Sequence, residues 1–563
     1  MKNDYLDIMA RVVEVYSGKR FDDYIDNVKE HGITEHGFPR LCANIGILMA
    51  HGRKLELKYR FDEMMELCCR DIPTFYSEKG KRGNDFSVRE IVSCILELEK
   101  AGLYPEETIT YWKNCMRAIE PTTYYRMVAP IPVKAVDNWA AFNAASEQIR
   151  CQSGLAATQD YIENQIASQM FSFDENGMYR DPNDPMVYDI VTRNMLSACL
   201  YYGYNGSHKA KLEEHLEKSG KCTLLMQSVN GEMPYGGRSN QFLHNEAHMA
   251  VIFEYMACMS LKNGDLESAG IYKAAANLAV KQLIHWLDIA PGQHIKNYYP
   301  QDSFFGCENY AYYDKYMVTV ASFLYLAYTF CDDSINPGTC PAEDSLSYTF
   351  QTSDAFRKLF CKAADYFVEL ETKSDHHYDA EGIGRIHRRG APTAICLSVP
   401  APVSPNYSIE KPNPLPLAIC CGFRNDSTWK YAFDPDCTCQ ITEHFSNNHS
   451  ASASLCYHFQ GNTVLSKHVH IDNTGVEVSV KGDGEVGMLL PAFHFDGKHQ
   501  TIIQQTENTL SIRYLNWVCT YRTNSAIDNL QIECANRNGI YRLYRATADK
   551  ELSVHISIDA AEN

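Results

Sequence analysis

The sequence predicts an α-helical toroid followed by an antiparallel β-sandwich. Its 563 residues exceed the roughly 250 to 300 at which a single hydrophobic core stops growing, so we expect more than one domain. Helical hydrophobic patterns follow one another to about residue 370, and short β-branched or alternating segments take over after Asp375. We therefore predict a multidomain chain, with a toroid (an incomplete α/α barrel) over residues 1–372 and a sandwich over residues 373–563.

The helical patterns are separated by short breaks. Several are apolar around most of their circumference, as over residues 317–324, which is typical of an inner ring packed between neighbours. No fixed-period motif recurs, so helical hairpins that close into a toroid are favoured over a consensus repeat array. The clear patterns cover residues 55–69, 87–101, 105–119, 138–151, 158–170, 185–202, 209–226, 239–261, 266–287, 310–330 and 354–370.

The segments after Asp375 have the rhythm of an antiparallel sandwich. Turn signals such as Asp472-Asn473-Thr474-Gly475 lie between them. The expected strands include residues 393–399, 417–423, 452–459, 464–471, 476–480, 509–514 and 554–558.

Charge and composition limit the compartment and the partners. A net charge of −18 argues against nucleic acid as a partner, because phosphate binding depends on Lys and Arg. Acids near the N-terminus interrupt any secretion signal, and no window approaches ~18 apolar residues, so we expect a cytoplasmic protein without a membrane partner. The 21 cysteines are then expected to be reduced thiols. Cys437 and Cys439 lack a second ligand pair, so no metal and no cofactor are predicted.

The densest polar stretch covers residues 230–248. Gly236 and Gly237 permit a tight turn that would present Arg238 at the start of a helix. Free backbone N–H groups and the helix dipole both favour an anion at such a position. We therefore expect Arg238 to bind a carboxylate ligand.

Further polar side chains follow on the predicted helix. Gln241, His244 and His248 share one face by their spacing of three and four residues, and Asn240 flanks it. This arrangement suits the polar end of a cavity at the mouth of the toroid. The alternative is that these side chains cap the helix and satisfy buried carbonyls. A zinc protease is disfavoured because Glu246 lies about 200° round the helix from His244.

A second cluster covers residues 297–316 and is rich in tyrosine. Aromatic faces stack on sugar rings while neighbouring acids and amides bind hydroxyl groups. Asp302 and Glu308 are candidates for the catalytic acid and base, Tyr310 is a further catalytic candidate, and Tyr316 is a candidate for sugar contacts. For Tyr316, packing between helices is an equal alternative.

Two smaller clusters complete the candidate site. Asn138 and Trp139 open a predicted helix, where the indole would serve as a sugar platform or as a core anchor. Arg385 and His387 belong to the basic run 384–390, which would close one side of a site for an acid or form a charged strand edge.

Four stretches together resemble a known class of carbohydrate enzymes. They are Asn138-Trp139, residues 234–240, the tyrosine-rich residues 309–316, and residues 490–497 near the end of the chain. With the order of helices before strands, they look like the (α/α)-toroid carbohydrate-active enzymes of gut bacteria, which include heparinase II/III-like uronate lyases and exo-acting β-glucuronidases. The resemblance implies a uronic-acid substrate, either an acidic oligosaccharide or a glucuronide.

The two chemistries of this class need different residues. Hydrolysis needs two carboxyl groups, one of which stays protonated. The pool comprises Glu246, Glu308, Asp302, Glu232 and Glu147. A lyase needs a group that neutralises the uronate carboxylate, a base for the C5 proton and an acid for the leaving oxygen. Asn240, Arg238, His244, Tyr235 and Tyr310 could serve.

Uronate lyases of this class often carry an Asn-His pair, whereas the order here is His244-Asn245. We therefore expect an exo-acting glycoside hydrolase that releases glucuronic acid. A lyase of oligouronides is the first alternative and a non-catalytic glycan-binding protein the second. The sequence leaves a homo-oligomer open.

Overall fold

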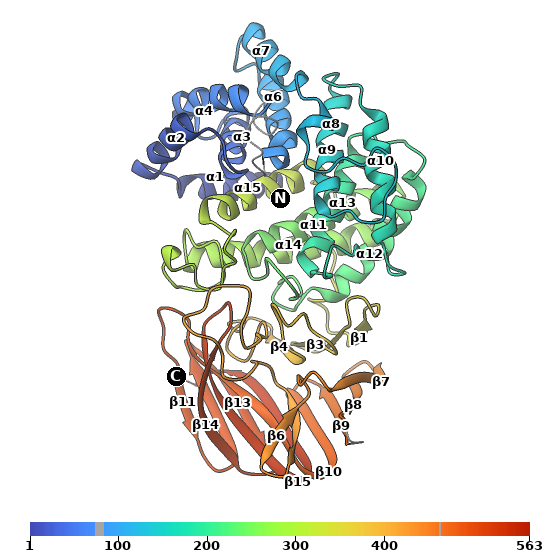
Figure 1. Ribbon diagram of the computed structural model, residues 1–563, viewed down its shortest axis with the longest axis vertical. Coiled ribbons are helices and arrows are strands. Elements are labelled where there is room, and N and C mark those ends of the chain that lie inside the picture. Colours follow the sequence, from blue (N-terminus) through green and yellow to red (C-terminus); the bar gives the residue numbers. More distant parts are fainter. Residues whose placement is uncertain (74–83, 461–462, 563) are drawn as a thin grey trace.

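The computed structural model describes residues 1–73, 84–460 and 463–562. Helices occupy the N-terminal part of the chain and strands the C-terminal part (Figure 1), which confirms the predicted fold class of a helical domain followed by antiparallel sheets. Among the described residues, the last helix ends at Phe330 and the first strand begins at Tyr348. The boundary predicted at residue 372 therefore falls after three of the strands.

The helix predicted over residues 354–370 is wrong. This segment contains β2 (Lys358–Ala363) and β3 (Tyr366–Glu371), and every residue of both strands is buried. A strand that is covered on both faces has no alternation of polar and apolar residues, so its hydrophobic pattern does not distinguish it from a buried helix.

Among the described helices, six form a closed ring. In the order α3, α6, α9, α11, α13 and α15, each contacts the next, and α15 returns to α3. The outer helices α1, α4, α7, α10, α12 and α14 each pack against at least one member of the ring. The bounds are α1 (Lys2–Glu14), α2 (Lys19–His31), α3 (Gly37–Ala50), α4 (Lys58–Asp71), α6 (Val88–Ala101), α7 (Glu106–Arg117), α8 (Pro121–Tyr124), α9 (Asn138–Gln152), α10 (Gln159–Gln169), α11 (Met186–Tyr201), α12 (Lys209–Met226), α13 (His244–Lys262), α14 (Leu266–Ile289) and α15 (Tyr313–Phe330), with 3₁₀ turns η1 (Leu55–Leu57), η2 (Asn84–Ser87), η3 (Met170–Ser172) and η4 (Gln301–Ser303).

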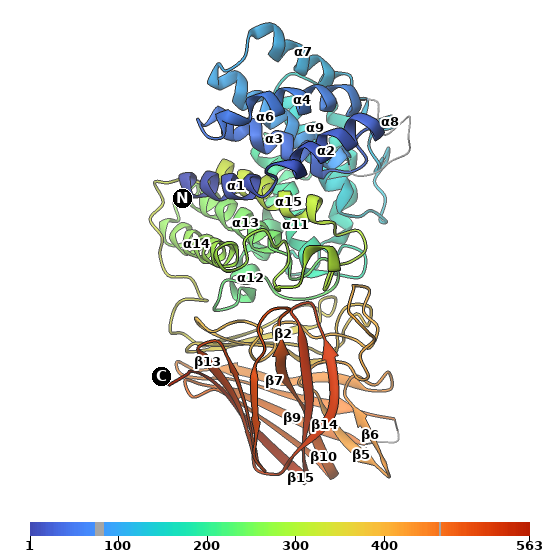
Figure 2. The same cartoon turned by 90° about the vertical axis from the view of Figure 1, so that its left-hand side faces the viewer.

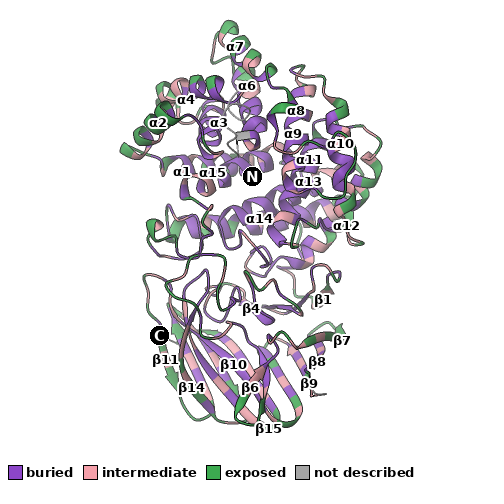
Figure 3. Cartoon of the chain, in the orientation of Figure 1, coloured by how far each residue is buried: buried purple, intermediate pink, exposed green. Residues whose placement is uncertain are grey.

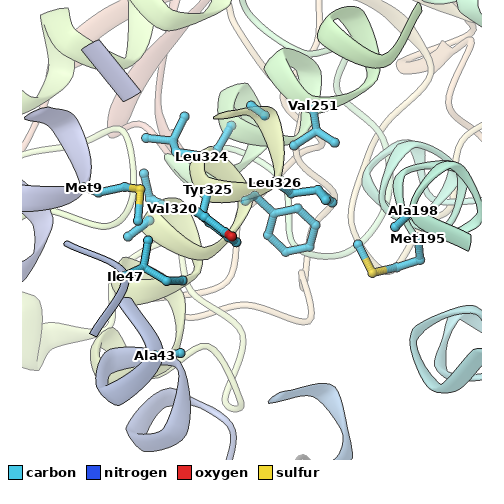
Figure 4. Close-up of a cluster of buried hydrophobic side chains, with 14 of the residues drawn as sticks. Met9, Ala43, Ile47, Met195, Ala198, Val251, Val320, Leu324, Tyr325 and Leu326 are labelled. Carbon is cyan, nitrogen blue, oxygen red and sulfur yellow. The ribbon is translucent and has the colours of Figure 1, made fainter. Parts of the chain in front are cut away.

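The ring helices are buried around most of their circumference (Figure 3). Val320 of α15, for example, lies beside Met9 of α1 and Ile47 of α3 (Figure 4). Burying each such side chain contributes about 1.5 to 3 kcal/mol, so this packing stabilises the closed ring. Within the described residues, no helix combines the length and apolar character that a membrane span requires.

The larger of the two sheets follows the order β11-β12-β13-β15-β10-β9-β8-β7, with β14 beside β15 and with β5 joining β10 to β6. Its two long strands, β10 and β15, pair along their length, and each changes its second partner on the way. The bounds are β5 (Cys421–Asn425), β6 (Thr428–Tyr431), β7 (Thr438–Ser446), β8 (Ala451–His458), β9 (Val464–Ile471), β10 (Val476–Phe495), β11 (Ile502–Gln505), β12 (Thr509–Tyr514), β13 (Trp517–Thr523), β14 (Ile527–Ala535) and β15 (Ile540–Ala560).

A smaller sheet, in the order β1-β2-β3-β4, lies between the helices and the large sheet (Figure 2). It comprises β1 (Tyr348–Gln351), β2, β3 and β4 (Gly382–Arg388). Leu359 and Cys361 pack into the core shared with the large sheet, whereas Phe360 and Phe367 pack against Met186 and neighbouring residues of the helical domain. The small sheet therefore joins the two domains through both of its faces.

Candidate active site

A cavity of about 470 Å³ opens among the N-terminal ends of the ring helices. Each of the six helices contributes residues from its first turns or from just before its start. The unpaired N–H groups of a helix start carry partial positive charge, so six such ends together favour an anionic ligand. The lining residues are His36, Arg40, Phe86, Arg126, Asp137, Asn138, Trp139, Phe142, Val187, Tyr188, Val191, Arg238, His244, His248, Tyr310, Lys315, Tyr316, Thr319 and Phe323.

The charged side chains of the cavity are mostly basic. Arg40, Arg126, Arg238 and Lys315 line it, and Asp137 is the only acid among the described lining residues. Asp137 caps α9 by accepting a hydrogen bond from a backbone N–H at 3.0 Å, and it lies 3.7 Å from Arg126. Lys315 forms no ion pair with a described residue. Arg40 pairs with Glu90 at 3.4 Å and Arg238 pairs with Asp181, and both of these acids lie outside the described lining.

Arg238 reaches the cavity from a turn that contains two glycines. Gly236 and Gly237 have φ of 141° and 72°, which L-residues with side chains rarely adopt. The Arg238 guanidinium forms an ion pair with the buried Asp181 and donates to the Pro182 carbonyl at 2.9 Å. The expected position at a helix start is wrong, because α13 begins only at His244. Arg238 therefore stands on a loop that the ion pair and backbone hold in place.

Two tyrosine hydroxyls meet at one serine. The Ser239 hydroxyl lies 3.1 Å from the Tyr188 hydroxyl and 3.1 Å from the Tyr310 hydroxyl. Burial, together with the nearby Glu308 carboxylate, raises the pKa of Tyr310. Tyr310 is therefore protonated at neutral pH.

Two histidines of α13 line the cavity, as their spacing predicts. The His244 and His248 rings lie 5.1 Å apart, and the Tyr316 ring also lies 5.1 Å from His244. Burial, with the charge of Arg40, lowers the pKa of His244 to about 3. Its Nδ1 has no hydrogen-bond partner among the described residues. His244 is therefore a neutral imidazole at neutral pH.

Acid should destabilise the protein through its buried histidines. An unfolded histidine takes up a proton at about pH 6.5, whereas folded His244 does so only near its lowered pKa of about 3. The unfolded state therefore binds more protons between these values, and the free energy of unfolding falls as the pH falls. At about pH 5 this one group costs about 2 kcal/mol.

Urea unfolding of the wild type and His244→Gln between about pH 7 and pH 5 tests this. The variant should lose less stability over the interval. His294, whose pKa burial lowers to about 4, remains in both proteins and acts in the same direction. Equal losses in the two proteins would contradict a neutral buried His244.

Asn138 and Trp139 also line the cavity. The Asn138 backbone and side-chain N–H groups donate to Asp181 at 2.8 and 3.2 Å, so the carboxylate that pairs with Arg238 also fixes this residue. The Arg126 guanidinium lies 4.2 Å from the centre of the Trp139 ring. The indole is half-buried and has one face covered by this cation.

The predicted catalytic carboxylates are absent from the described cavity wall. Glu246 accepts a hydrogen bond from Lys296 at 2.7 Å, and Glu308 pairs with Arg537 at 2.7 Å. Both acids are about 1% exposed. Asp302 is exposed on the short turn η4. Glu246 and Glu308 therefore balance buried cations, and the structure does not bring the three acids together at the cavity.

Several predicted binding residues lie at the junction between the domains instead. Tyr235 is fully buried, with the Lys358 ammonium 3.5 Å from its ring centre. Arg385 donates to the Met233 carbonyl at 2.8 Å, and His387 lies 3.1 Å from the Ser398 hydroxyl. These side chains satisfy buried polar groups and do not line the cavity.

Asn240 and Gln241 are also outside the described lining. Gln241 precedes α13 and therefore does not share its face with His244 and His248, contrary to the prediction. Its side chain donates to Asn240 at 2.9 Å and accepts from Asn538 at 3.1 Å. Tyr310, Tyr316 and Arg238, in contrast, come together at the cavity although the first two lie more than 70 residues from the third.

The sequence prediction misses several residues of the cavity. Tyr188, Arg40 and Lys315 all lie within the first two turns of a ring helix. A polar side chain in the first turn of an otherwise apolar helix is the signal that would have found them, since the chain offers six such helices with a common direction. Asp181 has no such signal, because its role depends on a contact with Arg238 57 residues away.

No protein-family model matches the sequence, and no curated protein matches it. Solved structures do. The match to heparinase III has a TM-score of 0.50 and 10% identity, and covers 93% of this chain and 77% of that one. Streptomyces coelicolor A3 chondroitin AC lyase in complex with chondroitin sulphate gives a TM-score of 0.49, 10% identity and coverage of 98% and 82%. The match to a mutant of the heparan sulfate lyase HepC from Pedobacter heparinus has a TM-score of 0.48 and 9% identity, and covers 92% of this chain and 76% of that one. At such identity the likeness concerns the fold, and the chain shares with heparinase III a helical toroid followed by antiparallel β-sheets.

Proposed function

We propose that the protein cleaves an acidic oligosaccharide next to a uronic acid by β-elimination. The observation that carries this proposal is the composition of the cavity, which gathers four cations, tyrosine hydroxyls and neutral histidines but only one carboxylate among its described lining residues. Elimination uses cations, tyrosine hydroxyls and neutral histidines. The sequence alone favours hydrolysis over elimination, whereas the composition of the cavity favours elimination.

Glycoside hydrolysis fits this cavity poorly. It needs two carboxyl groups about 5 to 5.5 Å apart in a retaining enzyme and about 6.5 to 9.5 Å apart in an inverting one. Asp137 already caps α9 and faces Arg126. Glu246 and Glu308 balance Lys296 and Arg537 in the interior. No second acid from the described residues faces Asp137 across the cavity.

Arg238 is the best placed group to neutralise the uronate carboxylate. A guanidinium has five N–H donors in a fixed plane, and the ion pair with Asp181 and the bond to Pro182 leave others available. Drawing negative charge from the carboxylate acidifies the neighbouring C5 proton. Lys315, which has no ion pair with a described residue, adds to the positive potential.

His244 and Tyr310 supply the proton transfers. The neutral imidazole of His244, which lines the cavity, accepts the C5 proton, and the C5–H electrons form the C4–C5 double bond. The C4–O bond breaks with its electrons on the leaving oxygen, which takes the proton of the Tyr310 hydroxyl. The Tyr316 ring is near both groups, with its centre 5.1 Å from that of His244 and 6.2 Å from that of Tyr310.

The product distinguishes the alternatives. Hexuronic-acid oligosaccharides should yield a conjugated unsaturated uronate, which absorbs in the ultraviolet, and a chromogenic β-glucuronide should release no dye. Dye release, or free hexuronic acid without the unsaturated chromophore, would instead support the exo-hydrolase. Binding without either product would support a glycan-binding protein. Asp302→Asn is a useful control, because this exposed acid lies outside the described cavity wall and its loss should leave the elimination rate unchanged.

A further inference from the structure

The loop that presents Arg238 has an unusual backbone. Gly237, Ser239 and Gln241 all have positive φ, of 72°, 61° and 65°. Serine and glutamine rarely adopt this left-handed region, because their Cβ atoms crowd the backbone there. Such conformations persist only where the surroundings impose them.

Residues after the helical domain contact two of these three positions directly, at the Gly237 backbone and at the Gln241 side chain, while the Gln241 carbonyl accepts from the Lys296 N–H at 3.0 Å. The Gly237 N–H donates to Asp379 Oδ2 at 2.6 Å. At the other end of the loop, the Asn538 side chain donates to Gln241 Oε1 at 3.1 Å and to the Lys296 carbonyl at 2.9 Å. Asp379 precedes β4 and Asn538 lies between β14 and β15. Both are about 2% exposed, so water does not compete for these bonds.

The middle position is held through an ion pair. The Ser239 N–H donates to Glu308 Oε1 at 2.6 Å. Arg537, from the same connection as Asn538, binds both oxygens of Glu308 at 2.7 and 3.0 Å. Arg537 also donates to the Gly306 carbonyl at 2.7 Å and lies 4.1 Å from the centre of the Tyr407 ring. The bidentate pair thus fixes the carboxylate that fixes Ser239.

We infer that the C-terminal β part of the chain sets the geometry of the active-site loop, with Arg537 as a positioning residue. Arg537 orients Glu308, Glu308 holds the Ser239 backbone, and the Ser239 hydroxyl places Tyr188 and Tyr310 at 3.1 Å each. Arg537 does not line the cavity. Its effect on the reaction, which rests on the proposed function, is therefore transmitted through Ser239.

A double-mutant cycle on kcat tests this transmission. Arg537→Gln should lower kcat by about 10²-fold, because small displacements of catalytic groups have effects of that size, while KM changes little. Ser239→Ala should lower kcat as well, and the double variant should be no slower than the slower single variant. Additive losses would overturn the proposal. Guanidinium ion added to Arg537→Gln should restore part of the activity, which a general loss of structure would not allow.

Hydrogen exchange provides a readout that needs no substrate. In Arg537→Gln the amides of residues 236–241 should exchange faster, while those of α11 keep their protection. Asn538→Ala, a milder change, should speed exchange at Gln241 even if Arg537→Gln fails to fold. Arg389→Gln is the matched control, because it breaks a half-exposed pair with Asp365 at 2.8 Å in the same β part. If exchange in the loop is unchanged in both Arg537→Gln and Asn538→Ala, the positioning role is refuted. If the wild type has no lyase activity but the variants show the expected exchange, only the proposed function is refuted.

Discussion

Tyr310→Phe should lower kcat for β-elimination by about 10²- to 10⁴-fold, the usual contribution of a positioned general acid. Burial raises the pKa of Tyr310, so its hydroxyl keeps the proton that the leaving oxygen needs. Phenylalanine preserves the ring and its contact with Tyr316. We therefore expect KM and the melting temperature to change little, as measured by steady-state kinetics and thermal unfolding.

A substrate with a better leaving group sharpens this experiment. It needs less help from an acid, so the variant should recover most of its rate on a uronide that carries an activated aryl group on O4, the oxygen that leaves. Tyr111→Phe removes a hydroxyl from an exposed tyrosine on α7 and is the matched control. An unchanged kcat in Tyr310→Phe would assign proton donation to another group.

Arg238→Ala should lower kcat/KM by about 10²- to 10³-fold, because a group that stabilises developing charge contributes roughly this much. The variant removes the planar donor set next to the uronate carboxylate and leaves Asp181 as an uncompensated buried acid. Both effects disfavour an anionic substrate. Arg238→Lys should recover only part of the loss, because an ammonium keeps the charge without the bidentate geometry.

Neutral substrate analogues separate binding of the carboxylate from general damage to the site. Arg238→Ala should bind a methyl-esterified uronide as the wild type does, because the ester presents no negative charge. Arg11→Ala removes an exposed arginine that pairs with Asp288 at 2.7 Å, and it should leave all rates unchanged. Uronide affinity that survives Arg238→Ala would place the carboxylate elsewhere in the cavity.

Local patterns predicted the elements that have one clear period. The ring helices other than α3, and the strands β8, β9 and β12 of the large sheet, follow from hydrophobic spacing, and the two glycines before Arg238 do adopt positive φ. The pattern failed for β2 and β3 because both of their faces are covered. The sequence also could not reveal which face of a segment would be buried by a partner far along the chain.

Partners far along the chain also explain why Glu308 and Glu246 look like catalytic acids in the sequence. Glu308 looks like a catalytic acid beside its tyrosines, but its partner Arg537 lies 229 residues further on. Glu246 likewise meets Lys296, 50 residues away. Arg238 and Tyr310 were predictable as polar groups in glycine- and tyrosine-rich loops. Their common position and the contribution of Tyr188 depend on tertiary packing.

The closed ring constrains when the site can exist during synthesis. Arg40 of α3 donates to Thr319 of α15 at 3.0 Å, across a separation of 279 residues. An emerging chain therefore cannot complete the cavity wall until α15 has left the ribosome, and the contacts of Asn538 with the loop come later still. Partly made chains would carry the helices but no assembled pocket, so catalytic competence should appear only after Asn538 has emerged.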